Sequence, residues 1–354
     1  MRSPRRFLLA LVVAAVGAVA YVQAAAPVSA DVLTNAKHFF WAAGQAPPVA
    51  SPSAADSATN DLIWHGGNIG SGAIGVETKP AVYLIFWGPD WASGFQTSYT
   101  TGKLYSSQTL VNYVKSFFGN VGGSPWAGVQ TQYCNEVLPG STSCVGGAGY
   151  ITNPTHQLKG VWIDSTAVPS DIVTLGLAEN LINDPIATEA QRAAAHFGYD
   201  PTATYIILTP PEPIATGQPV YCGYHSQTAS VDGYGNPFRV QYAFIPWLNT
   251  NWPGVGVTGC GMHNVNATSD AFGNGVFDGY SIVTGHEYAE AVTDPDNVLS
   301  NQDGWNDAQG NENGDKCAWM NTQNIALGAR QFAVQPLWSN EAYDATGSGC
   351  VVSR

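Results

Sequence analysis

The chain has 354 residues, with 13 Lys and Arg against 26 Asp and Glu, which gives a formal net charge of −13. Only 11% of its residues are charged, 45% are hydrophobic, and 11 Trp and 16 Tyr contribute large aromatic side chains. The acidic balance, without any run of Lys or Arg after the first residues, argues against nucleic acid or an anionic membrane as a partner. We expect a folded protein with a polar but weakly charged surface.

The first thirty residues are predicted to be a secretory signal peptide. Arg2, Arg5 and Arg6 precede an uncharged apolar run over 7–22, and small-residue cleavage sites end at Ala24 and Ala30. The apolar run of roughly 16 residues is short of the ~20 needed to span a bilayer, so we interpret it as a signal rather than an anchor. The sequence therefore predicts a secreted, extracellular protein with no stable membrane insertion of the mature chain.

Residues 31–60 are predicted to be a linker or the remnant of a propeptide. The stretch "AAGQAPPVASPSAADSATN" at 42–60 consists mainly of Ala, Pro and Ser, a composition that does not bury a core. The remaining residues, 61–354, are long enough for one large domain or two small ones. We expect one domain there.

The domain is predicted to be a mixed α/β layer with helices packed on a sheet. Apolar runs predict strands at 81–88, 158–165, 203–211 and 238–247, the last as an edge strand or hairpin partner. Helical spacing of apolar residues predicts helices at 106–120, 169–184 and 280–293. The last ~60 residues are rich in Asn, Asp and Gly, so loops with short pieces of structure are expected there.

Six cysteines in an exported chain indicate three disulfides. Cys134 and Cys144 are predicted to close a short loop. Sequential pairing would add Cys222 with Cys260 and Cys317 with Cys350, but six cysteines allow 15 connectivities. The absence of any C-x-x-C argues against a zinc site made of cysteines.

The stretch "GHEYAEAVTDP" at 285–295 carries the chemistry of interest. On a helix, His286 and Glu290 lie one turn apart on the same face, where they can hold one metal ion. Glu287 lies beside that face, where a carboxylate can take a proton from water. The pattern is that of an H-E-x-x-H zinc peptidase with Glu in place of the second His. Zinc accepts carboxylate oxygen, although harder ions then compete better.

A third ligand is expected from "GWNDAQGNENGDKCAW" at 304–319, which offers Asp307, Glu312 and Asp315. One of Glu312 and Asp315 would bind the metal while the other orients His286 through its free ring nitrogen. The many oxygen ligands between 294 and 315 would also suit a structural Ca²⁺ ion, although they fit no EF-hand register.

A plainer interpretation also fits the sequence. An H-E-x-x-E pattern also occurs on solvated helix faces, since each of its residues is common there. The apolar and small residues around it favour a buried helix, where unpaired charges are costly. His225 is a candidate transition-state donor, with a hydrogen-bonded core histidine as the alternative.

Four segments in order resemble the phosphate-induced, exordium-like family and its bacterial secreted relatives. They are "WHGGNIGSGAIGVETKPAVYLIFWG" at 64–88, "YCGYHSQ" at 221–227, "DGYSIVTGHEYAEAVTDP" at 278–295 and "ENGDKCAW" at 312–319. The resemblance implies a zincin-like fold, with the active-site helix near 280–293. It singles out His286, Glu287, Glu290, Glu312 and Asp315, and it includes Cys222, His225 and Cys317. Asn313 departs from the family pattern, in which that residue tends to be apolar.

These observations together predict a secreted, metal-dependent hydrolase, a zinc peptidase acting on an extracellular protein or peptide. His286 and Glu290 would bind Zn²⁺ together with Glu312 or Asp315, Glu287 would be the general base, and His225 a second catalytic group. The alternative is a non-catalytic extracellular protein of exordium-like type that binds cell-wall or carbohydrate partners.

Overall fold

The computed structural model describes residues 37–45, 60–67, 74–98, 103–178, 183–212, 220–231, 237–251, 254–295 and 304–354. The described residues fall within the unit Leu33–Arg354, so this unit begins before the predicted boundary at 61. The predicted signal peptide at 1–30 and most of the predicted linker lie outside the described residues.

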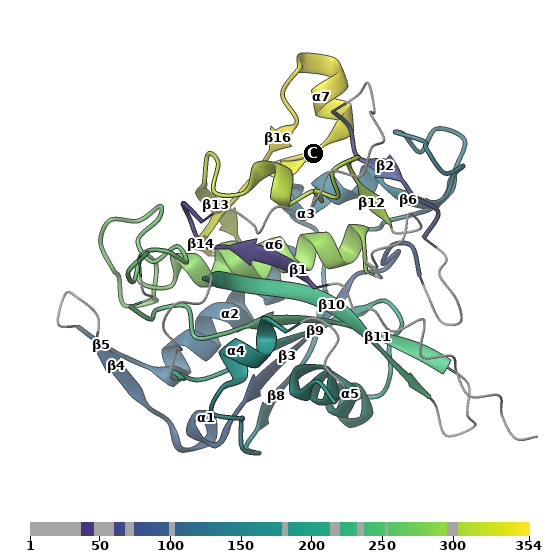
Figure 1. Cartoon of the computed structure of the whole chain (residues 1–354). Coiled ribbons are helices and arrows are strands. Elements are labelled where there is room, and N and C mark those ends of the chain that lie inside the picture. The colour runs from purple at the N-terminus through teal and green to yellow at the C-terminus, as the bar shows by residue number, and fades with distance from the viewer. Residues whose placement is uncertain are drawn as a thin grey trace, which may run out of the picture. The chain divides into compact units, whose positions relative to one another are not determined.

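A six-stranded mixed sheet forms the centre of this unit, in the order β1-β10-β11-β9-β3-β8 (Figure 1). Four neighbouring strands run parallel: β8 (Leu158–Asp164), β3 (Ala81–Trp87), β9 (Ala203–Leu208) and β11 (Pro237–Ile245). β10 (Tyr221–Val231) is antiparallel to β11, and β1 (His38–Trp41) is antiparallel to β10 at the edge. The four strands predicted from apolar runs are confirmed, and β11 is a hairpin partner inside the sheet.

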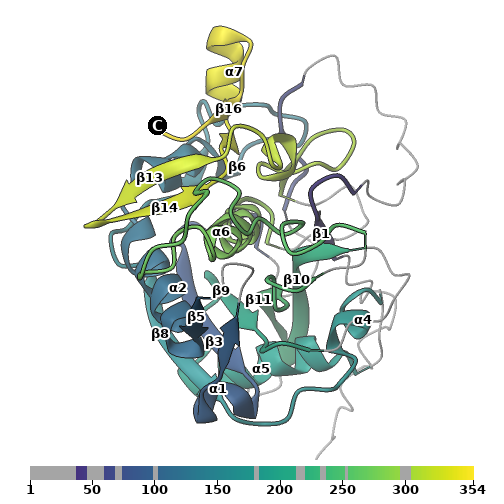
Figure 2. The ribbon, with the colours of Figure 1, turned by 90° about the vertical axis from the view of Figure 1, so that its left-hand side faces the viewer.

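Two helices cover opposite faces of the sheet near β10 and β11. α6 (Asp278–Thr293) lies on one face and α5 (Pro185–Phe197) on the other, as two views agree (Figures 1 and 2). α2 (Ser107–Val121), the helix predicted at 106–120, packs near β3 and β8. The shorter helical pieces are α1 (Pro89–Ser93), α3 (Pro125–Gly128), η2 (Val129–Gln132), α4 (Ile172–Gly176), η3 (Asp315–Cys317) and α7 (Asn340–Thr346).

The helix predicted at 169–184 is wrong in extent. Only the five residues of α4 are helical in its described part, and the long helix of this region is α5, which begins where the predicted one ends. Asp184 is the N-cap of α5, because its carboxylate accepts hydrogen bonds from the backbone of Ile186 and Ala187, and Pro185 fits the first helical position. Asp184 and Pro185 therefore mark the start of a new helix and not the end of the predicted one.

Every residue of α6 is buried. The helix lies between the sheet and the C-terminal hairpin β13 (Gln323–Leu327)–β14 (Arg330–Val334), and Figure 2 shows it end-on between them. Gly279 permits the close approach of the backbone at Cys260 to α6, since a Cβ there would lie 2.0 Å from the Cys260 carbonyl oxygen. The predicted helix at 280–293 is thus confirmed and begins two residues earlier.

The remaining described residues form loops and two-stranded pairs, as predicted for the C-terminal region. The pairs are β2 (Ile63–Trp64) with β12 (Trp305–Asn306), β4 (Gln96–Ser98) with β5 (Leu104–Ser106), β6 (Cys134–Glu136) with β7 (Ala148–Tyr150), and β15 (Leu337–Trp338) with β16 (Cys350–Val351). Together these elements make a mixed α/β fold with helices packed on the sheet.

Three disulfides join Cys134 to Cys144, Cys222 to Cys260, and Cys317 to Cys350. The first pair is the one predicted, and the other two follow the sequential order. None of the helices in the described ranges combines the length and apolar character needed to cross a bilayer. The three disulfides are consistent with an extracellular protein.

Arg192 on α5 is shared by two carboxylates, Asp164 at 2.6 Å and Glu189 at 2.7 Å. Burial, together with the nearby Asp164, raises the pKa of Glu189 to about 8, although Arg192 opposes the rise. In the unfolded chain the same group ionises near its ordinary value of 4.5. The folded state therefore holds an extra proton between these values, and the stability it contributes is lost as the pH rises through about 8.

We predict that Glu189→Gln flattens the fall in melting temperature between about pH 5 and pH 8.5, because the variant cannot titrate there. Calorimetry across this range measures the slope. Glu341→Gln, at an exposed position paired with Arg354, is the control and should keep the wild-type slope. Equal slopes for Glu189→Gln and the wild type would contradict the prediction.

Candidate metal centre

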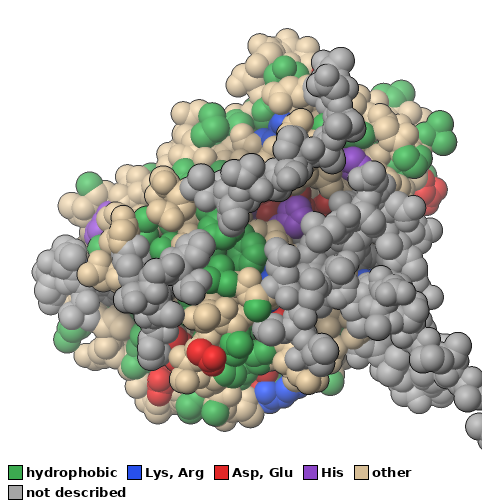
Figure 3. All heavy atoms as spheres, viewed as in Figure 1, with side chains coloured by type: hydrophobic (Ala, Val, Ile, Leu, Met, Phe, Trp, Pro, Cys, Tyr) green, Lys and Arg blue, Asp and Glu red, His purple; other side chains and the backbone are tan. Residues whose placement is uncertain are grey.

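Three histidines and four carboxylates meet above the β1–β10 edge of the sheet, on the side of α6. They are His38, His225, His286, Glu287, Glu290, Glu312 and Asp315. The side chains of His38 and Asp315 are 23% and 27% exposed, and the other five are almost completely buried. Figure 3 shows histidine and acidic side chains together near the middle of one face. The cluster is therefore a buried polar site with one partly open side.

His286 and Glu290 project from the same face of α6, one turn apart, as the sequence predicts. Nε2 of His286 lies 3.0 Å from Oε1 of Glu290. This contact is at ion-pair distance, but neither ring nitrogen of His286 makes a hydrogen bond, although the ring is fully buried. A buried imidazole is normally hydrogen-bonded, so His286 fits a role in which a nitrogen lone pair binds a cation.

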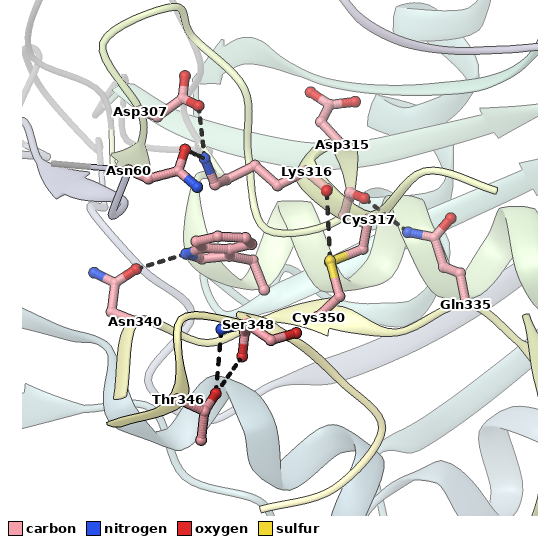
Figure 4. Close-up of a disulfide and its surroundings, with 12 residues drawn as sticks. Asn60, Asp307, Asp315, Lys316, Cys317, Gln335, Asn340, Thr346, Ser348 and Cys350 are labelled. Atoms are coloured by element: carbon pink, nitrogen blue, oxygen red, sulfur yellow. Dashed lines mark hydrogen bonds and ion pairs between the residues drawn. A yellow bond between two sulfur atoms is a disulfide. The ribbon is translucent and has the colours of Figure 1, made fainter. Parts of the chain in front are cut away.

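Asp315 approaches the same point from the C-terminal region. Its Oδ1 lies 3.7 Å from Nε2 of His286, and its backbone N–H donates to Oε1 of Glu290 at 2.9 Å. Asp315 begins the short η3 turn that ends at Cys317, and the disulfide to Cys350 fixes this turn (Figure 4). In the same view Lys316 reaches Asp307 and Asn60, away from Asp315.

The separations of these three groups suit a metal ion. Ligands at about 2.0–2.2 Å from a tetrahedral zinc lie about 3.3 Å from one another. The distances of 3.0 Å and 3.7 Å from Nε2 of His286 bracket that value. One imidazole nitrogen and two carboxylate oxygens form a donor set that zinc accepts.

Glu287 and His225 lie on the other side of Glu290. Nδ1 of His225, on β10, is hydrogen-bonded to Oε2 of Glu287 at 3.3 Å and lies 3.4 Å from Oε2 of Glu290. The other oxygen of Glu287 has no hydrogen-bond partner. Gly223 allows this approach, since a Cβ there would lie 2.8 Å from Oε1 of Glu287. His225 thus orients Glu287 beside the His286–Glu290 pair.

Glu312 occupies a different place from the one its spacing suggests. Its Oε1 lies 3.4 Å from Nε2 of His225, and its Oε2 lies 2.5 Å from Nδ1 of His38. Sequence reasoning has one of the two acids orient His286 by a hydrogen bond, and this contact does not occur. Glu312 instead contacts two histidines from the sheet, His225 on β10 and His38 on β1.

His38 is the member of the cluster that sequence analysis misses. It lies in β1, within the segment predicted to be a linker or propeptide remnant, and it pairs with His225 across the strands. The available signal is the aromatic stretch "HFFW" immediately before the Ala-, Pro- and Ser-rich residues. Nothing local in that stretch indicates which distant residues it meets.

The electrostatics of the cluster follow from burial and from the excess of acids. Burial raises the pKa of Glu287 to about 7, and the contact with His225 limits the rise. Burial and Glu290 also raise the pKa of Asp315 to about 8, although His286 opposes the rise. Burial by itself would lower the pKa of His286, but Glu290 outweighs it and the pKa rises to about 9. The raised pKa values show that ionising all four buried carboxyl groups together is unfavourable.

The acidic residues considered for a structural Ca²⁺ ion accept hydrogen bonds from the protein. Asp294 accepts from the Gly304 backbone and from Asn306, and Asp307 accepts from the Asn311 backbone and is paired with Lys316. Residues 296–303 of that loop lie outside the described residues.

Comparison of the chain with models of known families finds no match, and comparisons with curated proteins and with solved structures find none either. The resemblance to the exordium-like family therefore stays a prediction from sequence motifs.

Gly314 gives a direct test of this arrangement. A Cβ at this position would lie 2.8 Å from both Oε1 of Glu290 and Nδ1 of His286. We predict that Gly314→Ala separates Asp315 from this pair and lowers the affinity for a divalent ion by about tenfold, the lower end for changes beside metal ligands. Titration with Zn²⁺ or Co²⁺ measures the affinity.

Gly119→Ala is the matched control, because nothing lies within 4 Å of the added Cβ and the change favours helix. It should leave the affinity unchanged. An unaltered affinity in Gly314→Ala would show that the three groups do not act as one site.

Proposed function

We propose that this protein is a secreted, metal-dependent hydrolase of the zinc-peptidase type, with His286, Glu290 and Asp315 as the metal ligands. The observation that supports it is the convergence of these three side chains, from one helix and one distant turn, at a histidine ring whose nitrogens make no hydrogen bond. The three disulfides agree with an extracellular location.

The charge of the cluster favours a bound cation. Four carboxylates face three imidazoles, so with every group ionised the sum is 3 − 4, or one net negative charge. Each carboxylate is paired with a histidine ring. Buried charge of one sign is costly unless it is neutralised, and a divalent ion bound between His286, Glu290 and Asp315 would neutralise it.

The residues around these ligands supply the other requirements of hydrolysis. A bound zinc ion would polarise the carbonyl of the scissile bond and acidify a water molecule. Glu287 has a free carboxylate oxygen and a raised pKa, which suit a general base that takes the proton of the attacking water. Oε2 of Glu287 is hydrogen-bonded to His225, whose Nδ1 also lies 3.4 Å from Oε2 of Glu290, so the Glu287 carboxylate lies beside a proposed ligand.

His225 is the second catalytic group in this proposal. Its ring contacts Glu287 through Nδ1 and Glu312 through Nε2. These acids raise its pKa well above the ordinary value, against the opposing effect of burial. A protonated imidazole here would stabilise negative charge on the carbonyl oxygen or donate a proton to the leaving amine.

We predict that the chain purified without chelators holds about one zinc ion and that Glu287→Gln keeps this ion. Removing a general base lowers the turnover by roughly 10²- to 10⁴-fold. Elemental analysis measures occupancy, and a peptide-library cleavage assay followed by mass spectrometry measures turnover.

His286→Ala serves as the complementary variant, because it removes a ligand and should lose both metal and activity. Metal bound at wild-type occupancy in His286→Ala would contradict the ligand assignment. Undiminished hydrolysis in Glu287→Gln would contradict the assignment of the base.

A further inference from the structure

β1 lies directly on the candidate metal centre. Its four residues extend the sheet by antiparallel pairing with β10, with His38 opposite His225 and Phe40 opposite Gly223. His38 contacts Glu312, and the ring of Phe40 stacks on the imidazole of His286 with a centroid distance of 3.8 Å and an interplanar angle of 12°. Two alternate side chains of β1 therefore fill the space beside the ligands.

Successive side chains of β1 point to opposite faces of the sheet, so only alternate residues contact the cluster. His38 and Phe40 point toward α6, whereas Phe39 points to the opposite face, where it packs on Tyr221 and Tyr224. Phe40 is 2% exposed and lies between His286 and Trp319, whose ring is 4.6 Å away. The indole N–H of Trp319 donates to the Trp41 carbonyl at 2.9 Å.

These are the contacts by which a sheet edge binds an extended peptide. Main-chain pairing with an edge strand provides affinity, and pockets for alternate side chains provide specificity. Without β1, the β10 strand would itself be an edge beside the metal ligands, and the space between His286 and Trp319 would be a pocket for a flat side chain.

We propose that the β10 edge is a binding site for extended peptides with an aromatic residue, and that Lys37–Trp41 is an autoinhibitory segment that occupies it. The proposal rests on the proposed function, since it names the substrate class of that site and its regulation. The segment precedes the Ala-, Pro- and Ser-rich residues 46–59, and a cut within those residues would free it from the rest of the chain.

The competing interpretation is that β1 is a permanent strand of the fold. Lys37 favours that interpretation, because its ammonium group forms a buried ion pair with Asp184 at 2.9 Å and donates to the carbonyls of Gly176 and Ala178. The two interpretations predict opposite effects of removing the segment. Release of an inhibitor raises activity, whereas loss of an integral strand lowers stability and activity together.

The test uses the full chain with a site-specific protease sequence placed within residues 46–59. After cleavage and separation of the released peptide, we expect the catalytic efficiency toward a peptide containing Phe to rise by about tenfold. A tether on the order of fifteen residues holds its segment at a millimolar effective concentration, so a tenfold effect corresponds to a free peptide that inhibits at about 0.1 mM.

The released segment also gives a readout independent of activity. A labelled synthetic peptide with the sequence of residues 36–44, "AKHFFWAAG", should bind the cleaved chain, as measured by fluorescence anisotropy. The same peptide with Phe40→Ala should bind at least tenfold more weakly. Phe39→Ala, which removes a ring that is only half-buried, should cause a smaller loss.

The control carries the same protease sequence between Leu138 and Ser141. This exposed turn lies inside the loop closed by Cys134 and Cys144, so cleavage there releases nothing and should not change activity. If the cleaved chain unfolds, loses activity or fails to bind the peptide, the proposal that Lys37–Trp41 is an autoinhibitory segment is wrong. If the intact chain then still binds zinc and hydrolyses peptides, the proposed function stands. Absence of zinc and of hydrolysis in both forms overturns the proposed function itself.

Discussion

The main constraint on this structure is that four carboxylates and three imidazoles lie close together in a largely buried cluster. Such a cluster is costly unless its charge is neutralised, and acids exceed imidazoles by one. The surrounding structure holds these groups close together all the same. α6 is buried along its whole length, and the turn that begins at Asp315 is tied to Cys350 through Cys317. A site held together against its own charge is expected where a cation or a reaction makes use of that charge.

Two glycines and one disulfide determine how closely the parts approach. Gly223 brings the β10 backbone against Glu287, and Gly314 brings the C-terminal turn against His286 and Glu290. The disulfide from Cys317 then limits the freedom of the turn that carries Asp315. None of these residues is a proposed ligand, yet each sets the separation of side chains in the cluster. A ligand cluster drawn from several distant segments depends on such supports, because a displacement of 1 Å would exceed the tolerance of a metal coordination sphere.

The β1 strand connects the proposed chemistry with the proposed regulation. It completes the cluster with His38 and covers His286 with Phe40, and it does so from a sheet edge, where exposed backbone groups can pair with another strand. The same geometry that closes the site in this chain would position an extended substrate. The buried pair between Lys37 and Asp184 makes the segment a firmly held occupant, so its release would need a cut in the chain, followed by dissociation.

The sequence by itself determined the elements whose signals are local. Continuous apolar runs specify the strands at 81–87 and 203–208, and helical spacing that ends at Asp294-Pro295 specifies α6 with its His286–Glu290 pair. Short separation identified the Cys134–Cys144 disulfide. Only the tertiary structure shows that Asp315, and not Glu312, approaches His286. It also places His38 of β1 beside Glu312. The long helix of the region around 169–184 is α5, which begins at Pro185. The first two outcomes depend on contacts between residues far apart in the chain, which periodicity and spacing do not encode. The third depended on a cap and a proline, whose start signal outweighed the apolar pattern before it.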